Sequence, residues 1–296
     1  MYGEYLRTFT EDGIELQGLL CTPTVQTQKI GVLHIHGTAG NFYENRFIDH
    51  IAEVLVSLGY AFLTVNTRGH DVTATFLQRT EEGLKSVEIG SAYERFSDCL
   101  MDISAWLDVL EEHGYPNVVL EGHSLGTMKA VFYCSEVRDD RIKGLILMSP
   151  ADSIGYQQNR LGDRFPVTLQ LAKQMIKEGR EREWMPSDIF FYPVSAMTYV
   201  ERFDSQTKRA MFNFAGTYRR SFDELARIRV PILALLGTVG EAIVGEPKAF
   251  LSQLREAATA CPDCKTVVIQ GAPHSYLGHE RKVTQFIEQW MRALFG

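Results

Sequence analysis

The chain has 296 residues, of which 45% are hydrophobic and 23% charged, and its formal net charge is −7. This composition is ordinary for a globular protein long enough to bury a substantial core, and the acidic balance gives no reason to expect nucleic acid or an anionic membrane as a partner. No basic-then-apolar leader opens the chain and no apolar run approaches the length that spans a bilayer, so we expect a cytoplasmic protein.

The first predicted element is an antiparallel hairpin, because residues 4–9 and 14–21 alternate in polarity around a turn at 11–13. Six apolar segments of strand length follow, at residues 30–35, 61–65, 118–120, 145–148, 232–236 and 266–269. Apolar residues at helical spacing separate them, at residues 47–58, 96–110, after Ser124, 247–258 and 281–294. This alternation predicts the α/β class: a mostly parallel sheet covered by helices on both faces, with the hairpin at one edge.

Residues 153–225 interrupt the alternation. They contain no convincing apolar strand but hold twelve aromatic residues in 73 positions. An insertion that leaves such a sheet after a central strand lies above the crevice where these folds bind ligands. We therefore predict a core domain at residues 1–152 and 226–296 and a largely helical cap at residues 153–225. The aromatic residues form either the cap's own core or a wall of the ligand pocket.

The most informative motif is the pentapeptide Gly-His-Ser-Leu-Gly at residues 122–126. It follows an apolar strand and opens a helical pattern, which is the context of a G-x-S-x-G nucleophile elbow. The tight turn strains the backbone of Ser124, lifts its hydroxyl clear of the sheet and aims the backbone N–H of Leu125 at a bound substrate. We predict that Ser124 is a nucleophile and that Leu125 supplies one donor of an oxyanion hole.

The second oxyanion donor is expected in the loop that follows the strand at residues 30–35. Glycines at positions 37 and 40 let the backbone turn back on itself there. Thr38 is the predicted donor, and its neighbour Ala39 remains an alternative. A glycine-rich loop could instead cradle a phosphate, but this one has neither the Lys-Ser/Thr ending of a P-loop nor three spaced glycines.

A serine hydroxyl needs a base within hydrogen-bond reach, and histidine is the usual one. His274 is best placed, because it follows the strand at 266–269 and a turn at 271–273. His279, near the start of the next helix, is the second candidate. The other histidines near strand ends are predicted to support the loops of the site through hydrogen bonds; they are His34, His36, His70 and His123.

The third member of a triad is a carboxylate that fixes the imidazole tautomer and stabilises its charged form. Glu241 is the first acid beyond the strand at 232–236, and we choose it. The order Ser124, Glu241, His274 agrees with the order that goes with a nucleophile elbow. Asp152, which follows the strand at 145–148, is an alternative, and Glu246 is expected to cap a helix instead.

These motifs together resemble the α/β-hydrolase superfamily. The matching segments, in chain order, are His36-Gly37, Asn66–His70, Gly122–Gly126, Gly237–Val244 and Gly271–His274. The resemblance covers the chain from about residue 30 to its end without the insertion, and it implies an eight-stranded sheet, a cap over the pocket and no cofactor. Family members commonly carry an aspartate at the position that corresponds to 240 or 241. In this chain the one acid at these two positions is Glu241.

A serine at the elbow indicates acyl transfer, so the resemblance implies a carboxylic-ester hydrolase that acts on a small-molecule ester. Two alternatives remain open. One is a dedicated metabolic hydrolase for a siderophore ester, lactone, thioester or carbon–carbon diketone. The second is a non-catalytic ligand-binding protein that keeps the fold. The sequence also leaves the oligomeric state open, a homodimer included.

The chain has five cysteines, and Cys261 and Cys264 form a lone C-x-x-C. An odd, scattered set in a chain of this length does not indicate a disulfide framework. The pair is either a redox couple, half of a zinc site or two thiols in a surface loop. We expect the last and no metal site, because no second cysteine or histidine pair completes a zinc site.

Overall fold

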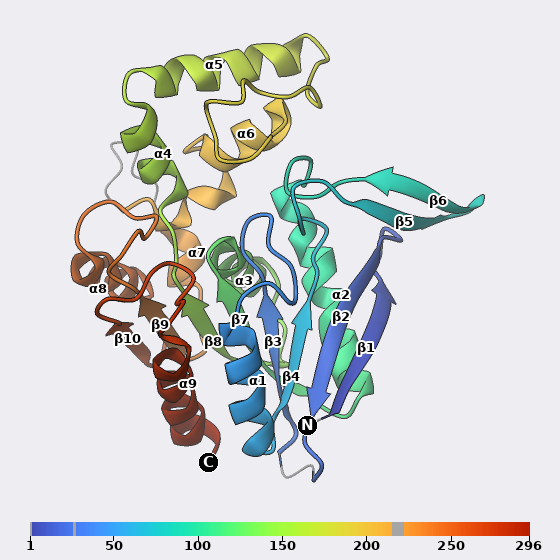
Figure 1. Cartoon of the computed structure of the whole chain (residues 1–296), viewed down its shortest axis with the longest axis vertical. Coiled ribbons are helices and arrows are strands. Elements are labelled where there is room, and N and C mark those ends of the chain that lie inside the picture. Colours follow the sequence, from blue (N-terminus) through green and yellow to red (C-terminus); the bar gives the residue numbers. More distant parts are fainter. Residues whose placement is uncertain (1, 26–27, 215–221) are drawn as a thin grey trace.

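The computed structural model describes residues 2–25, 28–214 and 222–296 (Figure 1). Its centre is an eight-stranded sheet in the order β1-β2-β4-β3-β7-β8-β9-β10. The strand β2 runs antiparallel to both of its neighbours, and every other neighbouring pair from β4 to β10 is parallel. The predicted α/β class and the place of the hairpin at one edge are confirmed.

The strands of this sheet are β1 (Tyr2–Phe9), β2 (Glu15–Thr22), β3 (Ile30–Ile35), β4 (Ala61–Val65), β7 (Asn117–His123), β8 (Ile142–Met148), β9 (Ile232–Leu236) and β10 (Cys264–Val268). Every residue of β3, β4 and β9 is buried, as expected of parallel strands with both faces covered. The edge strand β10 is only partly buried, and it begins two residues before the predicted strand at 266–269.

Helices cover both faces of the sheet (Figure 1). On one face, α1 (Phe47–Ser57) and α9 (Glu280–Phe295) pack together over one hydrophobic cluster. On the other, α2 (Cys99–Glu112), α3 (Leu125–Glu136) and α8 (Pro247–Ala257) contribute to a second cluster, with a 3₁₀ turn at Phe96–Asp98 before α2. Each of these helices was predicted from its apolar spacing.

The sequence did not predict a second small sheet, the antiparallel hairpin of β5 (Thr75–Thr80) and β6 (Gly83–Glu88). It projects beside the β1–β2 edge of the molecule in Figure 1. Most of its side chains are exposed, and Phe76 is its one buried residue among those described. A hairpin with so little buried surface lacks the apolar alternation by which strands are predicted.

The insertion is largely helical, as predicted. It contains α4 (Ser153–Leu161), α5 (Arg164–Lys177), α6 (Ala196–Phe203), a 3₁₀ helix (Lys208–Phe212) and α7 (Asp223–Ala226). The first three of these helices lie together at one end of the molecule and share a small hydrophobic core (Figure 1). Residues 215–221, with the aromatic Tyr218, belong to the predicted cap but lie outside the described residues.

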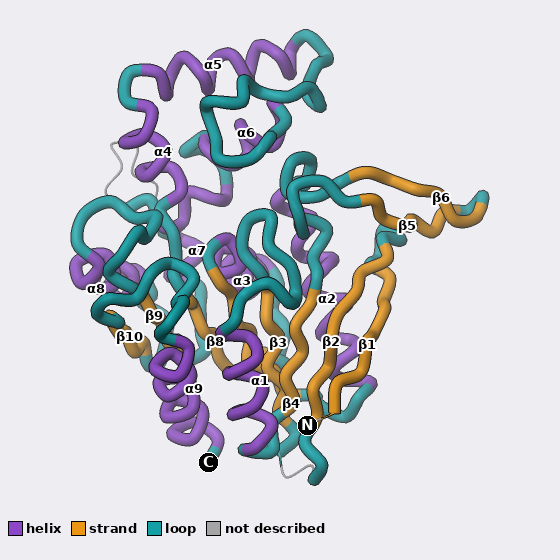
Figure 2. Tube along the Cα trace, viewed as in Figure 1, coloured by secondary structure: helices purple, strands orange, loops and turns teal. Residues whose placement is uncertain are grey.

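Figure 2 shows loops gathered between the sheet and the helices α4 to α6. These loops follow the carboxyl ends of the parallel strands, the edge at which open α/β sheets bind ligands. The predicted functional residues all lie on this side.

Candidate active site

Ser124 occupies the sharp turn between β7 and α3. Its backbone has φ 54° and ψ −118°, a conformation that a residue other than glycine rarely adopts. The turn is tight because Gly122 and Gly126 have no Cβ: one on Gly122 would collide with the backbone of Gly126, and one on Gly126 with the carbonyl oxygen of Ile35. The strained turn therefore presents the serine at the strand end, as the motif predicted.

His274 and Glu241 come from two loops that β9 and β10 bring side by side. Nδ1 of His274 lies 2.6 Å from Oε2 of Glu241, and the second carboxylate oxygen accepts a hydrogen bond from the backbone N–H of Gly237 at 2.8 Å. The Glu241 side chain is 3% exposed and that of His274 is 31% exposed. A buried, fixed carboxylate thus holds an accessible imidazole through one ring nitrogen.

Ser124 and His274 line the same cavity, together with Gly37, Thr38 and Leu125. No hydrogen bond joins the Ser124 hydroxyl to the His274 ring in the part of the chain that the structure describes. Contacts of this kind are often long before substrate binds and tighten in the reacting complex. The two side chains are therefore brought to one cavity, but they are not yet hydrogen-bonded.

The two rival acids are engaged elsewhere. Asp152 begins α4, where its Oδ1 accepts hydrogen bonds from the backbone of Gly155 at 2.9 Å and from Nδ2 of Asn213 at 2.8 Å. Burial raises the pKa of the Asp152 carboxyl. Glu246 stands at the N-terminal cap position of α8, as expected, although its side chain makes no capping hydrogen bond. Of these acids, Glu241 is the one that contacts His274.

The remaining histidines make contacts that suit the predicted supporting role. Nδ1 of His34 lies 2.8 Å from a carboxylate oxygen of Glu121 inside the sheet, and Nδ1 of His70 lies 3.1 Å from a carboxylate oxygen of Asp71. His279 stands at the N-terminal cap position of α9, is half-buried and does not line the cavity.

His123, the residue before Ser124, connects the loop of His274 to the elbow. Its Nε2 lies 2.9 Å from the carbonyl oxygen of His274, and burial holds the pKa of His123 well below its usual range. A neutral ring can donate from Nε2 to that carbonyl. The contact ties the backbone of His274 to the end of β7.

Ser149 and Tyr276 brace the acid, and neither was predicted from the sequence. The Ser149 hydroxyl donates to Oε1 of Glu241 at 3.0 Å, and the Tyr276 hydroxyl accepts from the Ser149 backbone N–H at 2.9 Å while donating to the Leu235 carbonyl at 3.0 Å. The position of Tyr276, two residues after His274, was the one available signal. No sequence signal pointed to Ser149, because its contact with Glu241 depends on the ends of three strands that come together only in the fold.

The two residues predicted to supply the oxyanion donors, Leu125 and Thr38, both line this cavity. Leu125 is the first residue of α3, where backbone N–H groups have no partner within the helix. Thr38 lies in the loop after β3, whose turn is closed by a hydrogen bond from the Gly40 N–H to the Gly37 carbonyl at 3.2 Å. Ala39, the alternative donor, has a strained φ of 52° and does not line the cavity.

The cavity has a volume of about 420 Å³. The sheet loops form its floor, and the insertion supplies Tyr156, Phe190, Phe191, Tyr192, Arg202 and Phe203 to its walls. The aromatic residues of the insertion therefore serve both predicted purposes, because others, such as Phe165 and Tyr199, lie in the core shared by α4 to α6.

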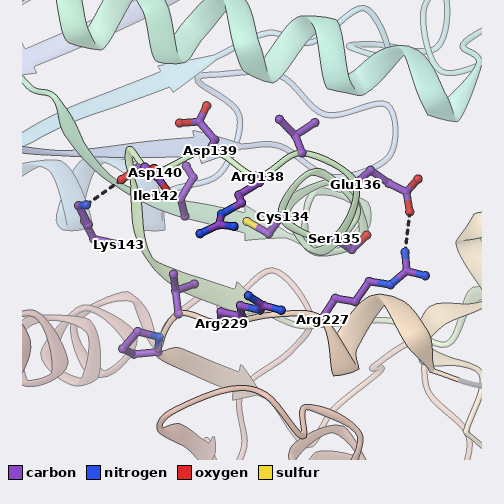
Figure 3. A pocket seen from close by; sticks show the side chains of 13 residues that line it. Cys134, Ser135, Glu136, Arg138, Asp139, Asp140, Ile142, Lys143, Arg227 and Arg229 are labelled. Carbon is purple, nitrogen blue, oxygen red and sulfur yellow. Dashed lines mark hydrogen bonds and ion pairs between the residues drawn. The ribbon is translucent and has the colours of Figure 1, made fainter.

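A larger cavity, of about 820 Å³, lies at the opposite ends of the strands, between the end of α3 and the segment before β9 (Figure 3). Charged side chains of both signs line it, and some are paired: Arg227 contacts Glu136 at 3.4 Å, and the Lys143 ammonium donates to the Asp140 carbonyl at 2.7 Å. None of the predicted site residues lies there.

Cys261 and Cys264 are both free thiols, at the start of β10 and away from Ser124. Their hydrogen bond lowers the pKa of Cys261 to about 7. Within residues 2–25, 28–214 and 222–296 no cluster of three or more histidine, cysteine, aspartate or glutamate side chains is arranged to hold a metal ion. None of the described helices is both long and apolar enough to cross a membrane.

Comparison with solved structures gives similar folds throughout. Est1E from Butyrivibrio proteoclasticus, solved with bound ferulic acid, is 20% identical, with a TM-score of 0.67 over 97% of this chain and 98% of that one. The siderophore hydrolase EstB from Aspergillus fumigatus is 15% identical, with a TM-score of 0.71 over 99% and 98% of the two chains. The Pyrococcus furiosus esterase Pf2001 is 16% identical, with a TM-score of 0.64 over 100% and 92%.

At these identities the likeness shows a common fold. Comparison with curated protein sequences gave no match. The sequence model of the alpha/beta hydrolase family, however, matches residues 32–287, which include the elbow and the loops of Glu241 and His274. The chain therefore belongs to the alpha/beta hydrolase family.

Proposed function

We propose that this protein is a serine esterase that hydrolyses small-molecule carboxylic esters through an acyl-enzyme. The observation that carries the proposal is the hydrogen-bonded pair of His274 and Glu241, which opens onto the same cavity as Ser124 on its strained turn. A nucleophile, a base and an acid that orients the base are the parts that acyl transfer requires.

In the first step the Ser124 oxygen attacks the ester carbonyl while Nε2 of His274 takes the hydroxyl proton. The carboxylate of Glu241, 2.6 Å from Nδ1, keeps the proton of the neutral ring on that nitrogen, so that Nε2 is free to accept. Once the ring is protonated, the same carboxylate stabilises its positive charge.

The tetrahedral intermediate carries its negative charge on the former carbonyl oxygen. The proposal assigns the stabilisation of that oxyanion to the backbone N–H groups of Leu125 and Thr38. A single donor of this kind is worth roughly a hundredfold or more in rate, because the donor is fixed before the charge develops.

Collapse of the intermediate breaks the bond to the alcohol, which leaves with the proton from Nε2 of His274. Water then enters, gives a proton to the same nitrogen and attacks the acyl group on Ser124. The second tetrahedral intermediate releases the acid and restores the serine. In this proposal the insertion, residues 153–225, acts as the cap that shapes the cavity for the acyl and alcohol groups.

The similar structures include esterases and a siderophore hydrolase, which supports hydrolysis of an ester over cleavage of a carbon–carbon diketone. A non-catalytic ligand-binding protein would have no need of a buried carboxylate against Nδ1 of His274.

The test is turnover of p-nitrophenyl acetate and butyrate by the purified chain. We expect an initial burst of p-nitrophenol, equal to the enzyme concentration if deacylation is slow, followed by steady hydrolysis. The variant Ser124→Ala should lose both phases while binding product unchanged. A wild-type chain that hydrolyses neither ester, or a Ser124→Ala variant that retains the activity, would overturn the proposal.

A further inference from the structure

The apolar wall of the active-site cavity is aromatic rather than aliphatic. Five aromatic side chains from the insertion line it: Tyr156, Phe190, Phe191, Tyr192 and Phe203. Apart from two alanines, the cavity's lining contains one aliphatic side chain, that of Leu125 beside the nucleophile, among the described residues. A cavity built for a saturated acyl chain would not need this bias.

These rings hold one another while leaving surface to the cavity. The ring centroids of Phe190 and Phe203 are 5.3 Å apart at an angle of 67°, and those of Phe190 and Phe191 are 5.6 Å apart at 56°. Phe203 is 2% exposed, whereas Phe191 is 59% and Tyr192 42% exposed. The buried Phe203 and the half-buried Phe190 thus help to fix Phe191 and Tyr192. The Arg160 guanidinium lies 4.7 Å from the centroid of the Phe191 ring, and the rest of the exposed aromatic surface is available to a ligand.

We propose that the natural substrate carries a planar aromatic group, on either the acyl or the alcohol side of its ester, that packs against Phe191 and Tyr192. This inference rests on the proposed esterase function. Aromatic rings prefer tilted and edge-to-face contacts with one another, beyond the apolar area that they bury. The cavity of about 420 Å³ has room for one ring and a short linker to the carbonyl.

The test compares esters that differ only in the saturation of one ring. Methyl 3-phenylpropanoate against methyl 3-cyclohexylpropanoate probes the acyl side, and benzyl acetate against cyclohexylmethyl acetate probes the alcohol side. We expect kcat/KM to favour the aromatic ester about threefold to tenfold in one pair, which then identifies the side. A merely hydrophobic wall would favour the larger saturated ring, so equal or reversed ratios in both pairs would overturn the inference.

Variants test whether the aromatic side chains of the cavity wall cause the preference for aromatic esters. Phe191→Leu and Tyr192→Leu keep the wall apolar and should bring the ratio close to one. Trp184→Leu is the matched control, because Trp184 is an exposed aromatic of the same insertion, at 45%, that does not line the cavity. Labelling of Ser124 by a fluorophosphonate distinguishes failure of this inference from failure of the proposed esterase function. An enzyme that is labelled but shows no preference for the aromatic ring refutes this inference alone. An enzyme that is not labelled refutes the esterase function.

A second inference has a different basis, a chain of buried polar groups that ends at the oxyanion loop. It starts at Lys129 on α3, whose ammonium lies 2.8 Å from a carboxylate oxygen of Glu94 and donates to the Thr67 hydroxyl at 3.0 Å. Both charged side chains are 1% exposed. A buried ion pair of this kind usually stabilises a fold no more than apolar residues of the same size would. The presence of the Lys129–Glu94 pair is therefore not explained by stability alone.

The chain continues from Thr67 to His36. Nε2 of His36 accepts a hydrogen bond from the Thr67 backbone N–H at 3.1 Å and lies 3.0 Å from the Thr67 hydroxyl. Burial lowers the pKa of His36 to about 3, so the ring is neutral and its single proton sits on Nδ1. That proton is donated to the Gly37 carbonyl at 2.7 Å.

The Gly37 carbonyl and the Thr38 N–H belong to one planar trans peptide, so they point in opposite directions. Fixing the carbonyl therefore fixes the direction of the N–H. We infer that Lys129 and Thr67 are positioning residues, which aim the Thr38 donor at the oxyanion through His36. This inference also rests on the proposed function.

The decisive variants are Thr67→Val, which removes the hydroxyl, and Thr67→Ser, which restores it. With active sites counted by fluorophosphonate labelling, we expect Thr67→Val and Lys129→Met to lower kcat about tenfold to a hundredfold with KM unchanged, and Thr67→Ser to recover most of the loss. A merely structural role would lower the Tm and the count of active sites but leave kcat per site intact, and that result would overturn the inference.

Lys129→Met could fail to fold, because it leaves the buried charge of Glu94 without this partner. The double variant Lys129→Met with Glu94→Gln removes both charges of this pair, while Arg202, 3.9 Å from Glu94, keeps its own. It should show the same fall in kcat. An unchanged kcat in a folded double variant would count against the inference as directly as an unchanged Thr67→Val.

Discussion

Nδ1 of His274 lies 2.6 Å from a carboxylate oxygen of Glu241, whose second oxygen is held by the Gly237 N–H and the Ser149 hydroxyl. The acid is thus fixed on one side by backbone and a hydroxyl and on the other by the imidazole. Its longer side chain, compared with the aspartate common in the family, reaches the ring from the loop after β9. This relationship distinguishes Glu241 from its rival acid, Asp152.

Replacement of Glu241 by glutamine should lower kcat about a thousandfold or more. The amide fits the same space, but it can donate a proton to Nδ1 and so favour the wrong tautomer of His274. Steady-state hydrolysis of p-nitrophenyl butyrate measures the loss. The control is Asp152→Asn, which keeps an acceptor for its contacts at the start of α4 and should change kcat less than tenfold. The reverse ranking would mean that Asp152 is the acid.

The burial of His36 predicts a pH dependence of stability. The pKa of His36 is about 3 in the folded chain and about 6.5 in the unfolded chain. Between these two pH values His36 therefore binds a proton in the unfolded chain but not in the folded chain. Stability from this group is therefore complete above pH 6.5 and is lost as the pH falls towards 3, by about 1.4 kcal/mol per pH unit.

Urea unfolding at pH 7 and pH 5 tests this dependence. Between these values the wild-type chain should lose about 2 kcal/mol more free energy of unfolding than His36→Asn, which cannot titrate. Equal losses in the two proteins would show that His36 is charged in the folded state at pH 5.

The thiol pair predicts a selective reactivity. The hydrogen bond with Cys264 lowers the pKa of Cys261 to about 7, although burial opposes the shift, and the pKa of Cys264 is raised. Alkylation by iodoacetamide, located by peptide mass spectrometry, should therefore begin at Cys261 and rise in rate with a midpoint near pH 7. In Cys264→Ala the midpoint should move up towards about 8.5. Preferential alkylation of Cys264, or a midpoint that the variant leaves in place, would contradict the assignment.

The fold followed from the sequence because its signals are local. The strand Ile30–Ile35 is buried along its whole length, so its apolar run was visible without any knowledge of its neighbours. The elbow was equally local, since the glycines that make room for the turn lie two residues on either side of Ser124. The mostly exposed hairpin of β5 and β6 had no such signal and was missed.

The site was predictable only in part, because its finer contacts join distant segments. Lys129 lies on a helix where a lysine is ordinarily solvent-exposed, and nothing near it in the sequence indicates a buried partner 35 positions away at Glu94. The bracing of Glu241 by Ser149 likewise depends on the pairing of β8 with β9. Residue type and chain order selected the proposed acting groups, whereas the groups that would orient them became visible only in the fold.

In the proposed mechanism Ser124 becomes acylated at a site assembled with His274. Incubation with a fluorophosphonate, followed by digestion and peptide mass spectrometry, tests it most directly. We expect one adduct per chain, on Ser124, formed at least about a hundredfold more slowly in His274→Ala and at the wild-type rate in His279→Ala. An adduct on another residue, or labelling of Ser124 that does not depend on His274, would contradict it.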